Sequence, residues 1–403
     1  MGNLRLPWFW SPIFGSYHPE EMKQHLFRVL FLRKEVNALE KQDLMRRAIT
    51  LAKQGIGAVD PNPLVGAVLV KDGHIIGEGY HACFGGLHAE RNALANCQTS
   101  PEGATLFVTL EPCCHYGKTP PCTDAILQAG IAKVIIGSRD PNPQVAGKGA
   151  ALLRQAGVAV EEDFLREECD ALNAPFFHYI TTKRPYVAMK YAMTADGKIA
   201  TANGASQWIT NEKSRRHVHL LRRQYQGILT GIGTVLADDP LLTCRLGDDG
   251  RNPIRIVCDS RLQIPLESNL VQTAKDIPLL VATCAHNPAK QKALEQAGVQ
   301  ILPFAGEHVP LPALMDALGA QQIGSILLEG GAALNAAILE AHLAQRFYVY
   351  IGAKLFGGIQ AKSPIGGTGV SLPKDAPALR LMETQTFGSD LLLVYEQAEQ
   401  EEC

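Results

Sequence analysis

The chain has 403 residues, a length that accommodates two or three domains of roughly 150 residues each. Apolar residues make up 46% of the sequence and charged residues 19%, so the chain can bury substantial cores and is not a disordered protein. The formal net charge of -2 gives little basis for binding a long nucleic acid by phosphate neutralisation. Small-molecule substrates are therefore favoured, and no nucleic-acid partner is expected.

The cysteine content and the hydropathy of the sequence indicate where in the cell the protein is expected. Ten cysteines are too few for a disulfide scaffold in a chain of this length, which favours a reducing environment. The sequence contains no run of about 18 apolar residues, which a membrane span would need, and its N-terminus lacks the pattern of an export signal. A cytoplasmic protein without a membrane partner is therefore expected. Residues 1–40 carry no recognisable chemistry and are interpreted as an N-terminal extension.

From residue 41 the sequence alternates between helical and strand-like patterns. A helical pattern over 43–54 ends at Gly55, and the strand segments 64–70 and 74–80 are joined by a short turn. The elements that follow are a helix from His88, a strand over 104–110, a helix over 123–129, a strand over 133–137, a helix ending at Gly157 and a strand over 158–160. This order predicts an α/β domain in which helices cover one sheet.

The pattern starts a second series around residues 181–185, where a domain boundary is expected. The elements of this series are a strand over 186–193, a basic helix over 211–224, strands over 227–230, 254–259 and 279–283, a helix ending at Gly298, a strand over 325–328, a helix after Gly331, a strand over 347–351 and a hairpin around Ser389. A second α/β domain is predicted. The chain then divides into an extension (1–40), a first domain (41–182) and a second domain (183–403).

His88, Glu90, Cys113 and Cys122 have the spacing of a metal centre. One imidazole and two thiolates suit tetrahedral zinc, and three protein ligands leave a fourth position for water, as in catalytic sites. Zinc can lower the pKa of water to about 7, and Glu90 would then carry protons. Because residues two apart point to nearly opposite sides of a helix, His88 is expected in the first helical turn.

The spacing of the two cysteines departs from the usual signature. Eight residues separate Cys113 from Cys122, whereas two separate the cysteines in zinc deaminases that edit nucleobases. Cys114 and His115 are therefore alternative ligands. The intervening loop contains glycine and proline and can fold back so that its ends share one metal, which favours Cys113 and Cys122. Cys122 also precedes a predicted helix, whose N-terminus should lower the pKa of its thiol.

The second half lacks the glycine fingerprint Gly-x-Gly-x-x-Gly, so an ordinary dinucleotide-binding Rossmann domain is not expected. A different phosphate-binding arrangement is present. The apolar strand 325–328 runs through Glu329 into Gly330 and Gly331, and a helix follows. Backbone N–H groups at such a helix N-terminus can approach a pyrophosphate.

Eight motifs stand out along the chain. They are Pro61-Asn62-Pro63-Leu64-Val65-Gly66, His88-Ala89-Glu90, the run from Leu110 to Cys122, the run from Asp140 to Gly147, Arg184-Pro185-Tyr186-Val187-Ala188-Met189-Lys190, Asp196-Gly197-Lys198-Ile199-Ala200, Ser206-Gln207-Trp208-Ile209-Thr210 and the run from Leu229 to Pro240. Together they resemble the bifunctional deaminase/reductase family of riboflavin biosynthesis. The resemblance covers residue 41 to the C-terminus. The eight-residue spacing is itself a mark of that family and supports His88, Cys113 and Cys122 as ligands of one zinc per chain.

The resemblance implies a cytidine-deaminase-like three-layer domain followed by a dihydrofolate-reductase-like domain. It also implies hydrolytic deamination of 2,5-diamino-6-(5-phosphoribosylamino)pyrimidin-4-one, with Glu90 moving the protons. NADPH would then reduce the ribosyl group to ribityl, giving 5-amino-6-(5-phosphoribitylamino)uracil. The preference for NADPH over NADH follows from the resemblance, with Ser260 and Arg261 as candidates for the 2′-phosphate. A homo-oligomer is also expected.

Further site residues follow from matching the family motifs. In the deaminase, Asn62, His81 and Lys118 would hold the pyrimidine, and Asp140 and Asn142 the ribosyl phosphate. The residues expected to face the nicotinamide cofactor are Ala192, Trp208, Thr234, Asp238, Ser260, Gly331, Ala332, Ala333, Leu334, Asn335, Ala336 and Ala337. Those expected to face the substrate of the reductase are Ser206, Arg222, Leu242, Arg245 and Glu329.

Lys190 and Glu329 are the hypothesised catalytic residues of the reductase. An ammonium and a carboxylate near the ring oxygen of the sugar could move the proton while the cofactor supplies hydride. A structural ion pair that lines a pocket is the alternative.

Three other interpretations remain. A nucleoside or nucleic-acid deaminase with an accessory reductase-like domain is disfavoured by the charge of -2 and leaves residues 185–403 without a use. A folate-type reductase with a relict zinc fold is disfavoured by the intact zinc-site residues. A zinc-stabilised, non-catalytic binding protein is disfavoured because closed structural sites normally use four protein ligands.

Overall fold

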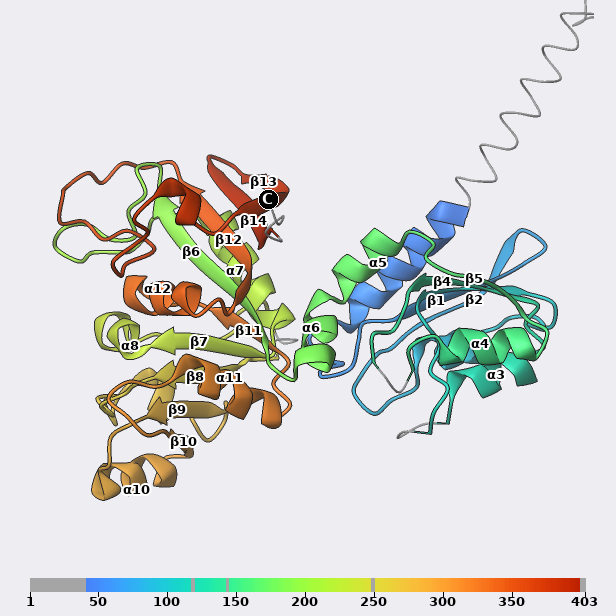
Figure 1. Ribbon diagram of the computed structural model, residues 1–403, viewed down its shortest axis with the longest axis horizontal. Coiled ribbons are helices and arrows are strands. Elements are labelled where there is room, and N and C mark those ends of the chain that lie inside the picture. Colours follow the sequence, from blue (N-terminus) through green and yellow to red (C-terminus); the bar gives the residue numbers. More distant parts are fainter. Residues whose placement is uncertain (1–40, 117–119, 143–144, 248–250, 399–403) are drawn as a thin grey trace, which may run out of the picture.

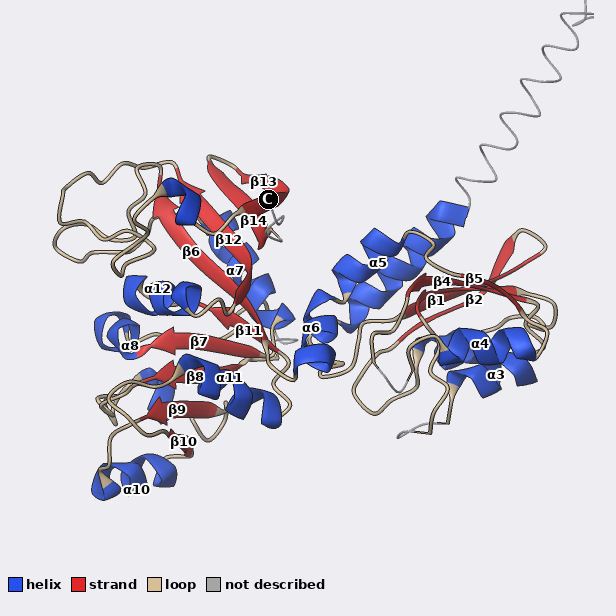
Figure 2. Cartoon of the chain, in the orientation of Figure 1, coloured by secondary structure: helices blue, strands red, loops and turns tan. Residues whose placement is uncertain are grey.

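The computed structural model describes residues 41–116, 120–142, 145–247 and 251–398 (Figure 1). These residues form two sheets, and Figure 2 shows helices beside both of them. The α/β class predicted for both halves is confirmed. In the described part of the chain, no helix is long and apolar enough to cross a membrane.

The first sheet has five strands in the order β2-β1-β3-β4-β5. The strands are β1 (Gly66–Lys71), β2 (His74–Tyr80), β3 (Thr105–Leu110), β4 (Lys133–Ser138) and β5 (Ala159–Glu161). The first three pair antiparallel and β3, β4 and β5 pair parallel. The predicted hairpin of β1 and β2 is confirmed.

Alternating side chains give this sheet two apolar faces. Leu106 and Val108 pack with α2 (Ala89–Ala95), α3 (Cys122–Gln128) and α4 (Lys148–Gln155). Phe107, between them in β3, packs on the opposite face with the helix over 41–52 and with α5 (Arg166–Leu172). Because consecutive strand residues point to opposite faces, this alternation produces a three-layer domain.

The second sheet has nine strands in the order β10-β9-β8-β7-β11-β6-β12-β14-β13. Its strands are β6 (Tyr186–Thr194), β7 (Gly227–Gly231), β8 (Ile254–Cys258), β9 (Leu279–Thr283), β10 (Val299–Pro303), β11 (Ser325–Leu328), β12 (Ala344–Gly352), β13 (Leu379–Phe387) and β14 (Asp390–Gln397). The strands from β10 to β12 are parallel, and β14 and β13 form the predicted closing hairpin.

Helices connect these parallel strands. They are α7 (Glu212–Gln224), α8 (Ile232–Asp238), α9 (Asn269–Gln272), α10 (Pro288–Gln296), α11 (Leu311–Ala320) and α12 (Ala332–Glu340), with short 3-10 turns at η1 (Lys53–Gly55) and η2 (Pro373–Asp375) elsewhere in the chain. Because helices join parallel strands, the carboxyl ends of β6, β7 and β11 meet at one edge.

The sequence patterns missed several elements. They did not identify α5, α6 (Ala174–Thr182), α8, α9, β10 or α11. The helix α8 begins directly after β7, because Gly231 is both the last residue of the strand and the N-cap of the helix, so no loop separates the two. A single residue, Asn173, separates α5 from α6 and occupies the N-cap position of the second helix. Closely spaced elements of this kind leave no break for a pattern to detect.

Candidate active sites

Three side chains in the first domain converge as a metal centre. Nδ1 of His88 lies 3.5 Å from Sγ of Cys113 and 3.4 Å from Sγ of Cys122. All three atoms lie within 4.8 Å of one another. Zinc with tetrahedral angles and ordinary bond lengths to nitrogen and sulfur would separate these atoms by about 3.6 Å. The donor set and its spacing therefore fit zinc.

The start of α2 positions both the histidine and the glutamate. His88 is the N-cap residue, with extended backbone dihedrals, and Glu90 lies in the first turn. The prediction that His88 lies at the helix start is confirmed. Because His88 precedes the regular helix, its imidazole can lie near the Glu90 carboxyl, which hydrogen-bonds with Cys122. Burial raises the pKa of Glu90, as expected for a carboxyl that exchanges protons near neutral pH.

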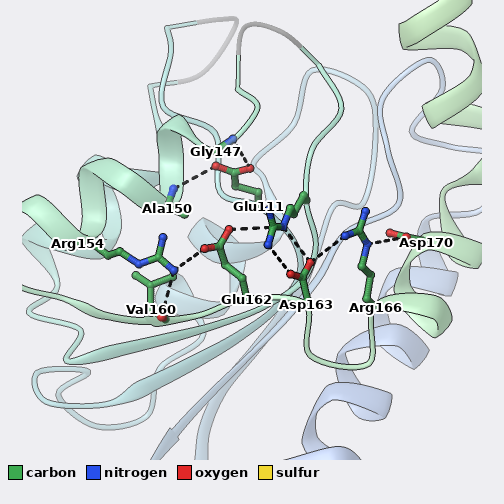
Figure 3. A network of polar contacts seen from close by, with 10 residues as sticks. Glu111, Gly147, Ala150, Arg154, Val160, Glu162, Asp163, Arg166 and Asp170 are labelled. Carbon is green, nitrogen blue, oxygen red and sulfur yellow. Dashed lines mark hydrogen bonds and ion pairs between the residues drawn. The ribbon is translucent and has the colours of Figure 1, made fainter.

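The neighbouring residue Glu111 fixes the approach of the chain to Cys113. Its carboxylate accepts hydrogen bonds from the N–H groups of Gly147, at 2.9 Å, and Ala150, at 3.1 Å, at the start of α4 (Figure 3). A Cβ on Gly149 would lie 2.1 Å from the Pro112 carbonyl oxygen, so the helix and the loop are in close contact. With the loop anchored in this way, Cys113 belongs to the metal group found among the described residues, whereas its neighbours Cys114 and His115 do not.

The start of α3 is directed at the thiol of Cys113. The backbone N–H of Cys122, the first residue of α3, lies 3.3 Å from Sγ of Cys113 and donates to it. Hydrogen bonds from Cys122 and His88 lower the pKa of Cys113 to about 4. The hydrogen bond to Cys113, together with burial, raises the pKa of Cys122. The backbone N–H at the start of α3 is thus directed at Cys113, and the lowered pKa of the Cys122 thiol in the zinc site stays a prediction.

Four of the five predicted substrate residues of the deaminase are described. His81 is buried, and its Nδ1 lies 3.0 Å from the carbonyl oxygen of Leu87. Burial lowers the pKa of His81, so the ring is neutral and its Nε2 can accept from the Asn62 amide at 3.1 Å. The His81 and His88 rings meet edge to face, with centroids 5.3 Å apart. Two predicted residues are thus held together beside the metal group.

Asp140 and Asn142 lie on a loop after β4. Asp140 accepts a hydrogen bond of 2.8 Å from the backbone N–H of Asn142. Burial raises the pKa of Asp140 to about 6. Lys118 lies outside the described residues. Nothing in the described contacts assigns the ribosyl phosphate to this loop, and that role stays a prediction.

The second domain contains a cavity of about 1200 Å³ at the carboxyl ends of its central strands. Small-molecule sites are typically about 300–1,000 Å³, so this cavity is large enough for a small-molecule ligand. The predicted residues that line the cavity are Lys190, Ala192, Ser206, Trp208, Arg222, Thr234, Asp238, Arg245, Ser260, Glu329, Gly331, Ala332, Ala333, Leu334 and Ala337.

Three predicted residues of the reductase do not line this cavity. Asn335 and Ala336 are buried on the far side of α12, where the Asn335 amide donates to the Pro364 carbonyl at 3.0 Å. Leu242 packs in the apolar core beside α8. The helical period of 3.6 residues explains the first pair, because a continuous run of residues cannot face one cavity. The exposed Arg261 does not line the cavity either.

Glu329 is the centre of a buried ionic network in this cavity. Arg222 contacts both carboxylate oxygens, through Nε at 2.7 Å and Nη2 at 3.0 Å, and Lys190 contacts one of them at 3.3 Å. Burial alone would raise the pKa of Glu329, but the charges of Arg222 and Lys190 outweigh it and lower the pKa. The carboxylate therefore stays ionised and orients the ammonium of Lys190. The two hypothesised catalytic residues are in contact.

The basic helix α7 contributes three cavity residues in addition to the predicted Arg222. Arg215, Val218, His219 and Arg222 all line the cavity. They follow the spacing i, i+3, i+4, i+7, which places them on one face of a helix. Burial, with the nearby charges of Arg222 and Arg245, lowers the pKa of His219 to about 4. The 3.6-residue period was therefore a signal that could have identified this face from the sequence.

Comparison with known proteins shows a match along both domains. Residues 39–138 match the cytidine and deoxycytidylate deaminase zinc-binding region, and residues 185–393 match the RibD C-terminal domain. The chain is 54% identical over 355 residues to a riboflavin biosynthesis protein RibD of Actinobacillus pleuropneumoniae, covering 88% of this chain and 94% of the relative. It is 40% identical over 367 residues to the Escherichia coli RibD, covering 88% and 99%.

Solved structures give the same result. A crystal form of Acinetobacter baumannii RibD superposes with a TM-score of 0.81 at 34% identity, covering 89% of this chain and 99% of that one. A diaminohydroxyphosphoribosylaminopyrimidine deaminase/5-amino-6-(5-phosphoribosylamino)uracil reductase of Thermotoga maritima superposes with a TM-score of 0.80 at 39% identity, with the same coverage of each chain.

These matches decide between the interpretations that the sequence left open. A nucleoside deaminase, a folate-type reductase and a non-catalytic zinc protein each account for one domain at most, whereas the relatives cover both. A zinc-binding deaminase domain and a reductase domain that uses a nicotinamide cofactor act on a small molecule. The chain belongs to the RibD family of bifunctional deaminases and reductases of riboflavin biosynthesis.

Proposed function

We propose that this chain deaminates 2,5-diamino-6-(5-phosphoribosylamino)pyrimidin-4-one in residues 41–182 and reduces the resulting uracil with NADPH in residues 183–403. The convergence of His88, Cys113 and Cys122 beside Glu90 carries the first half of this proposal. Four further parts of the proposal rest on the family resemblance and on composition. They are the choice of NADPH, a cytoplasmic location, a homo-oligomeric state and the role of residues 1–40 as an extension.

In the deamination, the protein supplies ligands, substrate contacts and a proton carrier. His88, Cys113 and Cys122 would hold zinc, which would supply Lewis acidity that makes water nucleophilic near neutral pH. Asn62 and His81 hold the pyrimidine so that water adds to the ring carbon bearing the 2-amino group. Glu90 takes a proton from the water and delivers protons to the leaving nitrogen, the C–N bond breaks and ammonia departs.

In the reduction, the cavity of the second domain holds both the cofactor and the phosphoribosyl group. Residues such as Trp208, Thr234 and Gly331 would hold the nicotinamide cofactor, which would supply hydride for C1′ of the sugar. Lys190 donates the proton to the ring oxygen as the ring C–O bond breaks, and Glu329 holds the ammonium in place. Arg222 fixes Glu329, and Arg245 contributes a positive charge for the substrate phosphate.

Substitutions of two adjacent cysteines, Cys113 and Cys114, test the metal centre. We expect Cys113→Ser to lose zinc and ammonia release together, because three ligands are the minimum for this site. Cys114→Ser is the matched control, since Cys114 lies next in the chain but outside the metal group. Metal analysis and an ammonia assay measure both effects, and NADPH-dependent reduction should persist in both variants. Equal zinc content and ammonia release in the two variants would contradict the ligand assignment.

A lysine substitution tests the second site. We expect Lys190→Ala to slow reduction about 10²–10⁴-fold, because it removes the proposed proton donor, and to leave deamination intact. Lys213→Ala, an exposed position on α7, is the control for loss of a positive charge. The measurement is NADPH oxidation with the deaminated substrate. If Lys190→Ala reduces the substrate at the parent rate, the Lys190–Glu329 contact is only a structural ion pair.

A further inference from the structure

Trp208 is exposed where it borders the reductase cavity. Its fractional exposure is 57%, and it lines both the large cavity and a second cavity of about 320 Å³. An exposed side chain samples several rotamers unless neighbouring groups hold it, and ordering it on ligand binding costs free energy. The contacts of Trp208 therefore determine whether its indole is in place before a ligand binds.

Arg215 contacts the indole directly. Its guanidinium carbon lies 4.6 Å from the centroid of the Trp208 ring, which is within the range of a cation–π interaction. Nη1 of the same guanidinium donates a hydrogen bond of 2.6 Å to the carbonyl oxygen of Thr210. Arg215 thus joins the ring to the backbone of the segment that carries it.

The end of β12 supports the same segment. Nζ of Lys354 donates a hydrogen bond of 2.6 Å to the carbonyl oxygen of Trp208. A Cβ added to Gly352 would lie 2.3 Å from the carbonyl oxygen of Ile209, so the two backbones are in close contact. The backbone of residues 208–210 is therefore held, and the remaining freedom lies in the indole itself.

The first turn of α7 places Arg215. Asp390, buried at the start of β14, accepts hydrogen bonds of 2.7 Å from the backbone N–H of Asn211 and from Oγ of Ser214. The Asn211 side chain caps the helix by accepting from the Ser214 N–H at 3.1 Å. The base of the Arg215 side chain is thereby tied to the sheet.

We propose that Arg215 is a positioning residue of the reductase, which holds the Trp208 indole at the edge of the cavity for contact with the nicotinamide cofactor. This inference rests on the proposed placement of the cofactor in that cavity. Without Arg215, binding of the cofactor has to order the indole. The cost falls on cofactor affinity and leaves the hydride-transfer step unchanged.

The sequence offers a direct spectroscopic test. Apart from Trp208, the only tryptophans are Trp8 and Trp10, so a full-length enzyme with Trp8→Phe and Trp10→Phe emits from Trp208 alone. Energy transfer from this indole to bound NADPH depends on their distance and orientation. We expect Arg215→Leu to lower the transfer at saturating NADPH and to raise KM for NADPH about three- to tenfold, with kcat little changed.

Two further variants complete the experiment. Arg216→Leu is the matched control, because Arg216 is the next residue of α7, is exposed and carries the same charge. Arg215→Lys keeps the charge without the planar fork, and an intermediate KM is expected; this variant decides the question if Arg215→Leu does not fold. Substitution of Arg215 in a Trp208→Phe background should produce no additional rise in KM.

The outcomes separate the two proposals. Absence of energy transfer in the Trp208-only parent at saturating NADPH would overturn the placement of the cofactor beside Trp208. Normal transfer with unchanged KM in Arg215→Leu would overturn the positioning role alone. A rise in KM that persists in the Trp208→Phe background would show that Arg215 contacts NADPH directly, which also overturns the positioning role.

Discussion

The Glu90→Gln enzyme will bind as much zinc as the parent and release ammonia about 10²–10⁴ times more slowly, because it keeps the ligands and loses the proton carrier. Glutamine has nearly the shape of glutamate and cannot exchange a proton with water or with the leaving nitrogen. The carboxyl of Glu90 is buried beside Cys122, so no solvent-exposed group replaces it. Metal analysis and an ammonia assay on the same sample measure the two quantities.

The control for this variant is Glu102→Gln, an exposed glutamate of the same domain. It should match the parent in zinc content and in both activities. Zinc content at the parent level and unchanged reduction in Glu90→Gln would together show that both domains are folded. Ammonia release at the parent rate from Glu90→Gln would overturn the proposed mechanism of the first site.

The Glu329→Gln enzyme will lose reduction and will be destabilised by about 3–5 kcal/mol at neutral pH. The substitution leaves the buried Arg222 without its bidentate carboxylate and Lys190 without its partner. Urea unfolding of the parent and the variant measures the difference in the free energy of unfolding. Glu295→Gln, exposed on α10, is the control and should unfold like the parent.

The difference in the free energy of unfolding between the parent and Glu329→Gln depends on pH because the pKa of Glu329 is lowered in the folded state. A carboxylate whose pKa is lower in the folded state stabilises the fold fully above the ordinary value of 4.5. The stabilisation is lost as the pH falls through the folded pKa. The difference between parent and variant should therefore be largest at neutral pH and shrink in acid. A difference that does not change between neutral and strongly acidic pH would contradict the ionic role of Glu329.

The metal centre could be predicted largely from the sequence. The histidine and the glutamate lie at the start of a predicted helix, and the class of metal follows from the ligand types. Residue spacing alone could not choose between Cys113 and Cys114, because adjacent loop residues have the same spacing to His88. The contact that decides between them joins Glu111 to the start of α4, 36 to 39 residues away in the sequence.

The reductase site could be predicted only in part. The strands that form it were identified, but their order in the sheet was not, and the site depends on that order. Glu329 and Arg222 are 107 residues apart and meet because β11 pairs with β7 and β6. For Asn335 and Ala336 the motif predicted too many site residues, because a continuous motif on a helix includes residues that face the core.

The central claim is that one chain performs both reactions in a fixed order on one phosphoribosylated pyrimidine. The most direct test is mass spectrometry of the diaminopyrimidine ribosyl phosphate after incubation with the zinc-loaded, full-length protein, with and without NADPH. The account predicts exchange of one amino group for oxygen without NADPH, and a further gain of two hydrogens only when NADPH is present. An unchanged substrate from protein shown to contain zinc would contradict the account.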